Sequence, residues 1–160
     1  ALLLRLADAA DSDGAAPLYR DPSQPATATP GEVPPAFAEH AARALQRALR
    51  EPGAVDEALG EWLSEPKPQV WFEAGGRWRP GQGLRLDRRT RMLYDRRCLY
   101  LNGEAFRAGG RDARLLRRLA DLGALSCADA SRLSGAAREI VAEWVEAGWL
   151  HATDDEDSHR

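Results

Sequence analysis

Residues 99–106, Leu-Tyr-Leu-Asn-Gly-Glu-Ala-Phe, are the stretch that decides the fold class. Asn102-Gly103 separates two apolar runs, and this dipeptide favours the positive φ angles of a two-residue β-hairpin turn. Upstream, residues 84–87 alternate between apolar and polar side chains, and residues 91–94 form another short strand-like run. The sequence therefore predicts several short strands, the last two of them joined in a hairpin.

The residues that follow the hairpin have the periodicity of helices. Asp112 is a candidate N-cap for a first helix that ends at Gly123, and its predicted core face consists of Leu115, Leu116, Leu119 and Leu122. Ser126 begins a short helix over 128–133, followed by a turn at Ser134-Gly135. A third helix is expected over 136–147, ending at Gly148, with inward-facing Ile140, Val141, Trp144 and Val145.

A final strand is expected at residues 149–152. Strands, helix, short helix, turn, longer helix and strand form the order of a winged helix-turn-helix domain, here residues 84–152. Together with the helices that precede it, this domain predicts an α+β fold that is mostly α.

Two further helices are expected over residues 35–65, in a helical hairpin. The first starts near Pro35, where proline suits the first turn, and stops at Glu51-Pro52-Gly53; the second covers about 55–63. Each carries one apolar stripe and needs a partner surface to bury it. The sequence thus predicts a dimerisation segment with the interface residues Phe37, Leu45, Leu49, Leu59, Trp62 and Leu63.

The remaining segments are expected to be ends and connectors. Residues 1–16 open in the pattern of a helix already under way, which predicts the end of a truncated upstream domain. Residues 17–34 form a Pro-rich connector. Residues 66–83 are expected to be a linker with a short strand at 70–73, and residues 153–160 an acidic tail that frays.

Charge is distributed unevenly along the chain. The net charge is −3, but residues 77–118 hold 13 basic and 4 acidic side chains, a local balance of +9. A block of this kind suggests nucleic-acid contact, with Arg88, Arg89, Arg91, Arg96 and Arg97 as the candidate basic patch. We favour the alternative that these arginines pair with the acidic segments on either side, within the chain or across a dimer.

DNA is an unlikely partner of the predicted winged helix. Its third helix would be the one that enters the major groove, yet its exposed positions, Arg138, Glu139, Glu143 and Glu146, carry a net charge of −2. Phosphates would repel this surface. The domain is better interpreted as a packing or interaction module.

Few residues suggest catalysis. None of the three histidines, His40, His151 and His159, has an acid two residues later, so the His-x-acid part of an iron facial triad is missing. His40 is expected to be an exposed surface histidine. Cys98 and Cys127 are expected to be structural thiols in a reducing cytoplasm. No apolar run approaches the roughly 20 residues that span a bilayer, so no membrane association is expected.

Several segments, in this order and spacing, resemble the bacterial JmjC/cupin-type ribosomal oxygenases, which include ribosomal protein arginine hydroxylases. Residues 19–22 and 30–34 are similar to the connector that follows the catalytic domain in that family, and residues 61–68 are similar to the end of its paired helices. Residues 89–94, 99–104 and 144–150 resemble its winged-helix region. The resemblance covers roughly residues 15–152.

This resemblance implies a parent enzyme that uses Fe(II), 2-oxoglutarate and O2 on a ribosomal protein, with homodimerising middle helices. It also implies a winged helix that packs near the parent's catalytic domain. The family's catalytic jelly roll has no counterpart in these 160 residues, so the resemblance implies no catalytic or metal-binding residue here. The chain is expected to be a non-catalytic C-terminal part. The alternatives are a winged-helix module that binds nucleic acid or protein, and a stand-alone scaffold.

Overall fold

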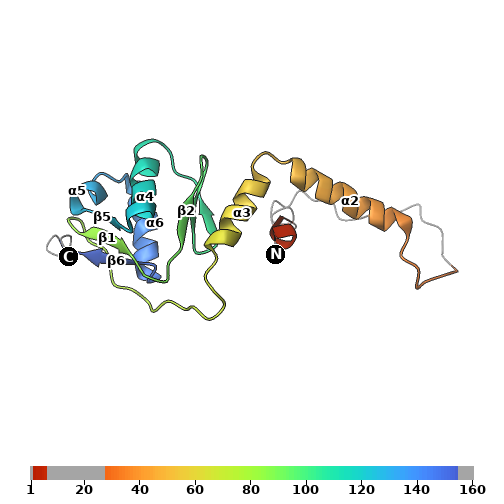
Figure 1. The fold of residues 1–160 in the computed structure, drawn as a ribbon, viewed down its shortest axis with the longest axis horizontal. Coiled ribbons are helices and arrows are strands. Elements are labelled where there is room, and N and C mark those ends of the chain that lie inside the picture. Colours follow the sequence, from red (N-terminus) through yellow and green to blue (C-terminus); the bar gives the residue numbers. More distant parts are fainter. Residues whose placement is uncertain (1, 7–27, 155–160) are drawn as a thin grey trace. The chain divides into compact units, whose positions relative to one another are not determined.

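The computed structural model describes residues 2–6 and 28–154 of the chain (Figure 1). The chain forms two compact units that divide between Trp62 and Leu63. Most of the predicted connector and the tail from residue 155 onward lie outside the described residues, as do residues 7–16 of the predicted upstream segment. None of the described helices has the length and apolar content needed to cross a membrane.

The first unit is helical. Residues 2–6 are helical, α2 runs Pro35–Arg50, and α3 runs Ala54–Ser64, with its last two residues in the second unit. α2 stops because Glu51 precedes a proline and adopts the extended conformation that proline imposes on its neighbour (φ −64°, ψ 123°). Both helices and the turn between them were predicted.

The two helices differ in what they bury. No residue of α2 is buried, and α2 has few contacts with α3, so the turn of the predicted hairpin is present without side-by-side packing of its arms. On α3, Ala58 is buried, as is Leu6 in the first described helical segment. Arg5 Nη1 lies 3.5 Å from Glu61 Oε2, so residues 2–6 lie against α3.

The second unit contains two small antiparallel sheets. One has the order β5-β1-β6, from Ala124–Leu125, Gly83–Leu86 and Leu150–Thr153. The other has the order β2-β3-β4, from Met92–Tyr94, Leu99–Leu101 and Glu104–Phe106. The predicted hairpin is confirmed: Leu101 faces Glu104, and Asn102 and Gly103 have φ angles of 50° and 94°.

Three helices complete the winged-helix order: α4 (Gly110–Leu122), α5 (Cys127–Ala130) and α6 (Gly135–Glu146). Figure 1 shows α4 and α6 between the two sheets, and α4 contacts both of them. Gly123 ends α4 with a φ of 70°, as expected of a glycine C-cap. Ser126 and Ser134 cap α5 and α6 through their side-chain oxygens.

The core of this unit lies where α4, α6 and the sheets meet. Phe106 contacts Trp144 edge to face at 4.9 Å between ring centroids. The residues around this pair are almost fully buried, and they include Leu84, Leu99, Leu101, Leu119, Val141, Val145 and Leu150. Each such aliphatic side chain contributes roughly 1.5–3 kcal/mol by leaving water.

Several details of the prediction were wrong. Residues 70–73 form no strand, because Val70 N donates to Lys67 O in a turn and Trp71 O accepts from an arginine side chain. Leu122 is 64% exposed instead of facing the core, because it follows the exposed Arg118 by four residues and lies on the same side of α4.

Asp112 is not the N-cap of α4. The helix begins at Gly110 after Gly109, without a side-chain cap. Asp112 Oδ1 instead accepts the backbone N–H of Ser134 at 3.0 Å, so the carboxylate joins α4 to the start of α6. A hydrogen bond with the Ser134 side chain is the largest of the effects that lower the pKa of Asp112, and the backbone hydrogen bond lowers it further.

Candidate functional site

The predicted dimer residues are all exposed apolar side chains. Phe37, Leu45 and Leu49 lie on α2, and Leu59, Trp62 and Leu63 lie on α3, each between 38% and 49% exposed. Within α2, the spacing of eight and then four residues places its three members on one face. Apolar faces left open in this way are typical of surfaces that bind a partner. The structure does not test the pairing itself, which stays a prediction.

The five arginines of the predicted basic patch do not all have the same surroundings. All five arginines are exposed, but the guanidinium groups of two of them hold the segment that leads into the winged helix. Arg91 Nη1 donates to Leu63 O and Glu65 O, each at 3.4 Å. Arg88 and Arg96 form no ion pair with any residue that the structure describes.

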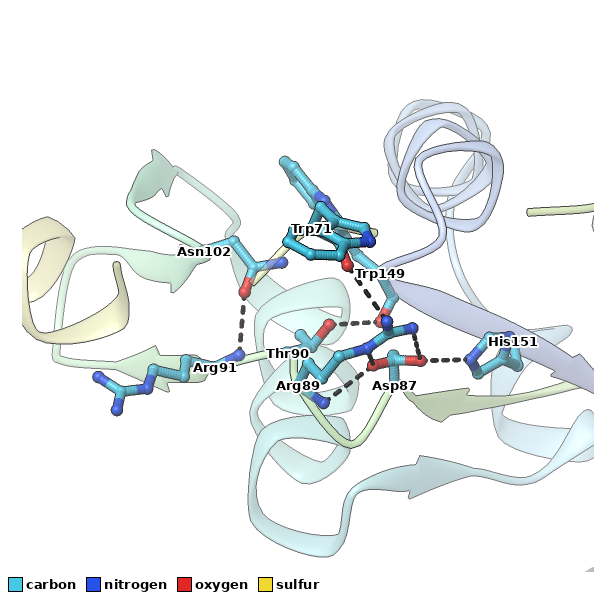
Figure 2. Close-up of polar contacts among 8 residues, drawn as sticks. All are labelled: Trp71, Asp87, Arg89, Thr90, Arg91, Asn102, Trp149 and His151. Atoms are coloured by element: carbon cyan, nitrogen blue, oxygen red, sulfur yellow. Dashed lines mark hydrogen bonds and ion pairs between the residues drawn. The ribbon is translucent and has the colours of Figure 1, made fainter. Parts of the chain in front are cut away.

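Arg89 is the most constrained member of the patch (Figure 2). Its Nε and Nη2 donate to the two oxygens of Asp87 at 2.8 and 3.1 Å, and its Nη1 donates to Trp71 O at 3.1 Å. The guanidinium also lies over the Phe72 ring, 5.5 Å from its centroid. Arg89 therefore fastens residues 71 and 72 to the turn after β1.

Asp87 is the centre of this cluster. Besides the Arg89 side chain, its carboxylate accepts the Arg89 backbone N–H at 2.9 Å and faces His151 Nε2 at 2.9 Å. The hydrogen bond from the Arg89 side chain is the largest of the effects that hold the pKa of Asp87 well below its usual range. The sequence analysis missed this site, because Asp87 and His151 are 64 residues apart and meet only through the pairing of β1 with β6.

The linker lies against the C-terminal end of α6. Gly75 N donates to Glu146 O at 2.9 Å, and Phe72 meets Trp149 edge to face at 6.4 Å. The backbones approach so closely that a Cβ atom on Gly75 would lie 1.9 Å from Val145 O. These contacts fix the linker to the helix that would read DNA in an ordinary winged helix.

Further along α6, the linker borders a groove of about 280 Å³. Trp78 and Pro80 form the linker side of this groove, and Arg138, Glu139 and Ala142 form the α6 side. The Trp78 ring is held in place by its Nε1–H, which donates to Gln82 O at 3.2 Å. The linker thus flanks α6 near both of its ends.

The face of α6 that remains exposed is acidic. Arg138, Glu139, Glu143 and Glu146 are all exposed, as the sequence predicted. Three carboxylates against one guanidinium disfavour the approach of phosphates. Charge and the bound linker both argue against DNA reading by this helix.

The candidate catalytic residues do not assemble into a site. His40 is half-buried, instead of fully exposed as expected, and His159 lies outside the described residues. Cys98 is buried and Cys127 is partly buried, and the two are not joined in a disulfide. Within residues 2–6 and 28–154, no group of three His, Cys, Asp or Glu side chains is placed to hold a metal ion.

The sequence profile of the ROXA-like winged helix family matches residues 42–151, more than half of the chain. The chain belongs to this family. The matched region of this ROXA-like protein begins within α2 and ends in β6, so it includes α3 as well as the winged-helix order of strands and helices. The family thus confirms the predicted winged-helix fold.

Solved structures of one Escherichia coli protein share the fold of this ROXA-like chain. An X-ray structure of YcfD superposes with a TM-score of 0.66 at 21% identity, over 94% of this chain and 44% of that one. The ribosomal oxygenase YcfD gives a TM-score of 0.66 at 20% identity, over 94% and 45%. A complex of YcfD with cobalt and 2-oxoglutarate gives 0.65 at 20% identity over the same shares.

This chain spans less than half the length of those structures. No curated protein matches the sequence. The comparisons with solved structures therefore establish the fold, and the family profile establishes the family.

Proposed function

We propose that this chain is the pairing segment and winged-helix region of a protein related to the 2-oxoglutarate-dependent ribosomal oxygenases. In this proposal the chain contributes no residue to the oxygenation reaction itself. The observation that carries it is the family match over residues 42–151 in a chain whose α2 and α3 leave apolar faces open. The similar YcfD structure is described as a ribosomal oxygenase, and one of its complexes holds cobalt and 2-oxoglutarate.

The described residues do not fit an Fe(II) centre, because no group of three potential ligands is assembled among them. We therefore place Fe(II) and 2-oxoglutarate on a catalytic domain outside residues 2–6 and 28–154. The proposed role of this chain is to pair two copies and to support that catalytic domain, whose substrate would be a ribosomal protein. Cys98 and Cys127 are not joined in a disulfide, which agrees with the reducing cytoplasm proposed as its location.

Pairing would be driven by the apolar stripe of α2. Phe37, Leu45 and Leu49 recur on one side of a helix that has no buried residue. A second copy that covered these three side chains and those of Leu59 and Trp62 would remove substantial apolar area from water, at about 25 cal/mol for each Å². The charged side chains of α2, among them Glu39, Arg43 and Arg47, would form the rim of such an interface.

The test measures Fe(II)-dependent turnover of 2-oxoglutarate by the natural gene product that contains this sequence, and by these 160 residues alone. We expect turnover by the former and none by the latter. We also expect Leu45→Glu with Trp62→Glu to lower turnover by the gene product while its winged helix stays folded. Turnover by the 160 residues, or its absence from the gene product, would contradict the proposal.

A further inference from the structure

We propose that an arginine-rich face formed by α4 and the outer side of β1 binds the phosphate backbone of RNA. This face, the α4–β1 arginine face, consists of Arg85, Arg111, Arg114 and Arg118. It shares no residue with the basic patch expected from the sequence and none with α6. The choice of RNA over other polyanions rests on the proposed function, because a protein that acts on ribosomal proteins works beside RNA.

Three of the four arginines lie along one side of α4. Arg111, Arg114 and Arg118 are exposed, and their spacing of three and then four residues keeps them on the same face of the helix. Over these seven residues the helix rises about 10 Å. The opposite face is fixed in the core by Ala113, Leu116 and Leu119, so the arginine side is held toward solvent.

Arg85 extends this face onto the neighbouring sheet. In β1, Leu84 is buried and Arg85 is exposed, as the alternation of a strand requires. A pocket of about 200 Å³ has both Arg85 and Arg118 in its lining, together with the hydroxyl-bearing Ser126 and Thr153. Guanidinium and hydroxyl groups are the donors that bind phosphate oxygens, and arginine does so with two parallel N–H groups.

The charge of this face is only partly neutralised within the described part of the chain. Arg85 and Arg114 form no ion pair there. Arg118 Nη1 lies 3.2 Å from Asp129 Oδ2, but Asp129 is shared with Arg132 at 3.5 Å, so one carboxylate serves two guanidiniums. Among the described residues, the alternative that the arginines pair with acidic segments accounts for Arg118 but not for Arg85 and Arg114.

The two acidic residues of α4 are also occupied elsewhere. Asp112 accepts the Ser134 backbone N–H at 3.0 Å, and Asp121 accepts the Tyr94 hydroxyl at 3.0 Å. Neither carboxylate forms an ion pair with an arginine of the face among the described residues. The α4–β1 arginine face thus provides the cationic row that backbone binding needs, without groups arranged to read bases.

The test is the binding of a fluorescein-labelled 20-nucleotide single-stranded RNA to the full chain, followed by anisotropy between 50 and 300 mM NaCl. Four phosphate contacts predict a slope of log K against log salt of about −3, since each contact on a single strand contributes about −0.7. Arg85→Ala with Arg114→Ala removes two contacts and should bring the slope to about −1.4. At 50 mM salt, the same relation predicts binding about 60-fold weaker.

The matched control is Arg88→Ala with Arg96→Ala, which removes the same charge from exposed arginines that lie off this face. We expect its slope to stay near −3. Arg85→Lys with Arg114→Lys should retain most of the slope, because lysine also neutralises phosphates. Arg111→Ala, a single change on the helix surface, should reduce the slope by about 0.7 and provides a second variant if the double variant does not fold.

Three results would overturn the proposal: no salt-dependent RNA binding, an equal loss in the control pair, or equally tight binding of a 20-base-pair DNA duplex or a poly-glutamate peptide. None of them bears on pairing or on 2-oxoglutarate turnover, which are measured without RNA. The failure of this inference is therefore distinguishable from the failure of the proposed function.

Discussion

Replacing Gly75 by alanine should detach the linker from α6. A Cβ atom at this position would lie 1.9 Å from Val145 O, whereas such contacts essentially never fall below 3.0 Å in real proteins. The obstacle is a backbone oxygen of a helix packed in the core, so the linker has to move by about 1 Å or more. This movement would break the hydrogen bond from Gly75 N to Glu146 O.

The expected decrease in the free energy of unfolding of Gly75→Ala has two parts. A typical intramolecular hydrogen bond contributes about 1 kcal/mol net. Forcing an extra methyl group into a closely packed site costs about 1–3 kcal/mol. We therefore expect the free energy of unfolding to fall by about 2–4 kcal/mol, which corresponds to a urea midpoint lower by roughly 1 M or more for a domain of this size.

The neighbouring glycine provides the control. A Cβ atom on Gly76 meets nothing within 4 Å, so Gly76→Ala should leave stability unchanged or raise it by about 0.4–1 kcal/mol through the unfolded chain. Both variants are compared by urea unfolding, followed through tryptophan fluorescence and circular dichroism. Equal midpoints for the two variants would refute the claim that the linker is fixed against α6.

Three further predictions concern the same unit. Gly148→Ala should destabilise more than Gly123→Ala in the same urea assay: both glycines have positive φ angles (74° and 70°), but only at Gly148 would the Cβ atom meet a backbone oxygen, Glu73 O, at 1.9 Å. Because the pKa of Asp87 is lowered on folding, its contribution is complete above the unfolded pKa and is lost as the pH falls below it; Asp87→Asn should therefore destabilise at neutral pH, and the difference from wild type should shrink below about pH 4. A difference that instead grows in acid would contradict this sign. Leu119→Ala should cost about 2–5 kcal/mol, whereas Leu122→Ala should change stability by less than about 0.5 kcal/mol, because the first side chain is fully buried and the second is 64% exposed; similar thermal midpoints for the two would contradict the observed burial.

Local chemistry explains the parts of the fold that were predictable. Asn102-Gly103 specifies its hairpin because few residue pairs adopt two successive positive φ angles. Ser126 and Ser134 specify helix starts because their hydroxyls satisfy free backbone N–H groups within three residues. Each of these signals depends only on neighbours in the sequence.

The missed features depend on contacts between distant segments. Asp112 has a good capping side chain, yet the start of α6 lies close enough to take its carboxylate. Likewise, nothing in the sequence around residues 70–73 indicates that this segment is held by Arg89. The candidate surfaces follow the same rule. The helical periodicity of the chain predicted the apolar stripes. Only the fold separates Arg89, which holds the linker, and Arg91, which holds the residues just before it, from Arg85 and Arg114, which do neither.

The central claim, that α2 and α3 pair two copies of the chain, is tested most directly by the mass in solution, measured by size-exclusion chromatography with light scattering at moderate salt. The monomer mass is 17.5 kDa, and we expect about twice that value. Leu45→Glu with Trp62→Glu should return the monomer mass, whereas Leu93→Glu with Trp71→Glu, which alters exposed side chains of the second unit, should leave the dimer intact. A wild-type chain that stays monomeric at all concentrations, or a dimer that survives the first pair and is lost with the second, would contradict the account.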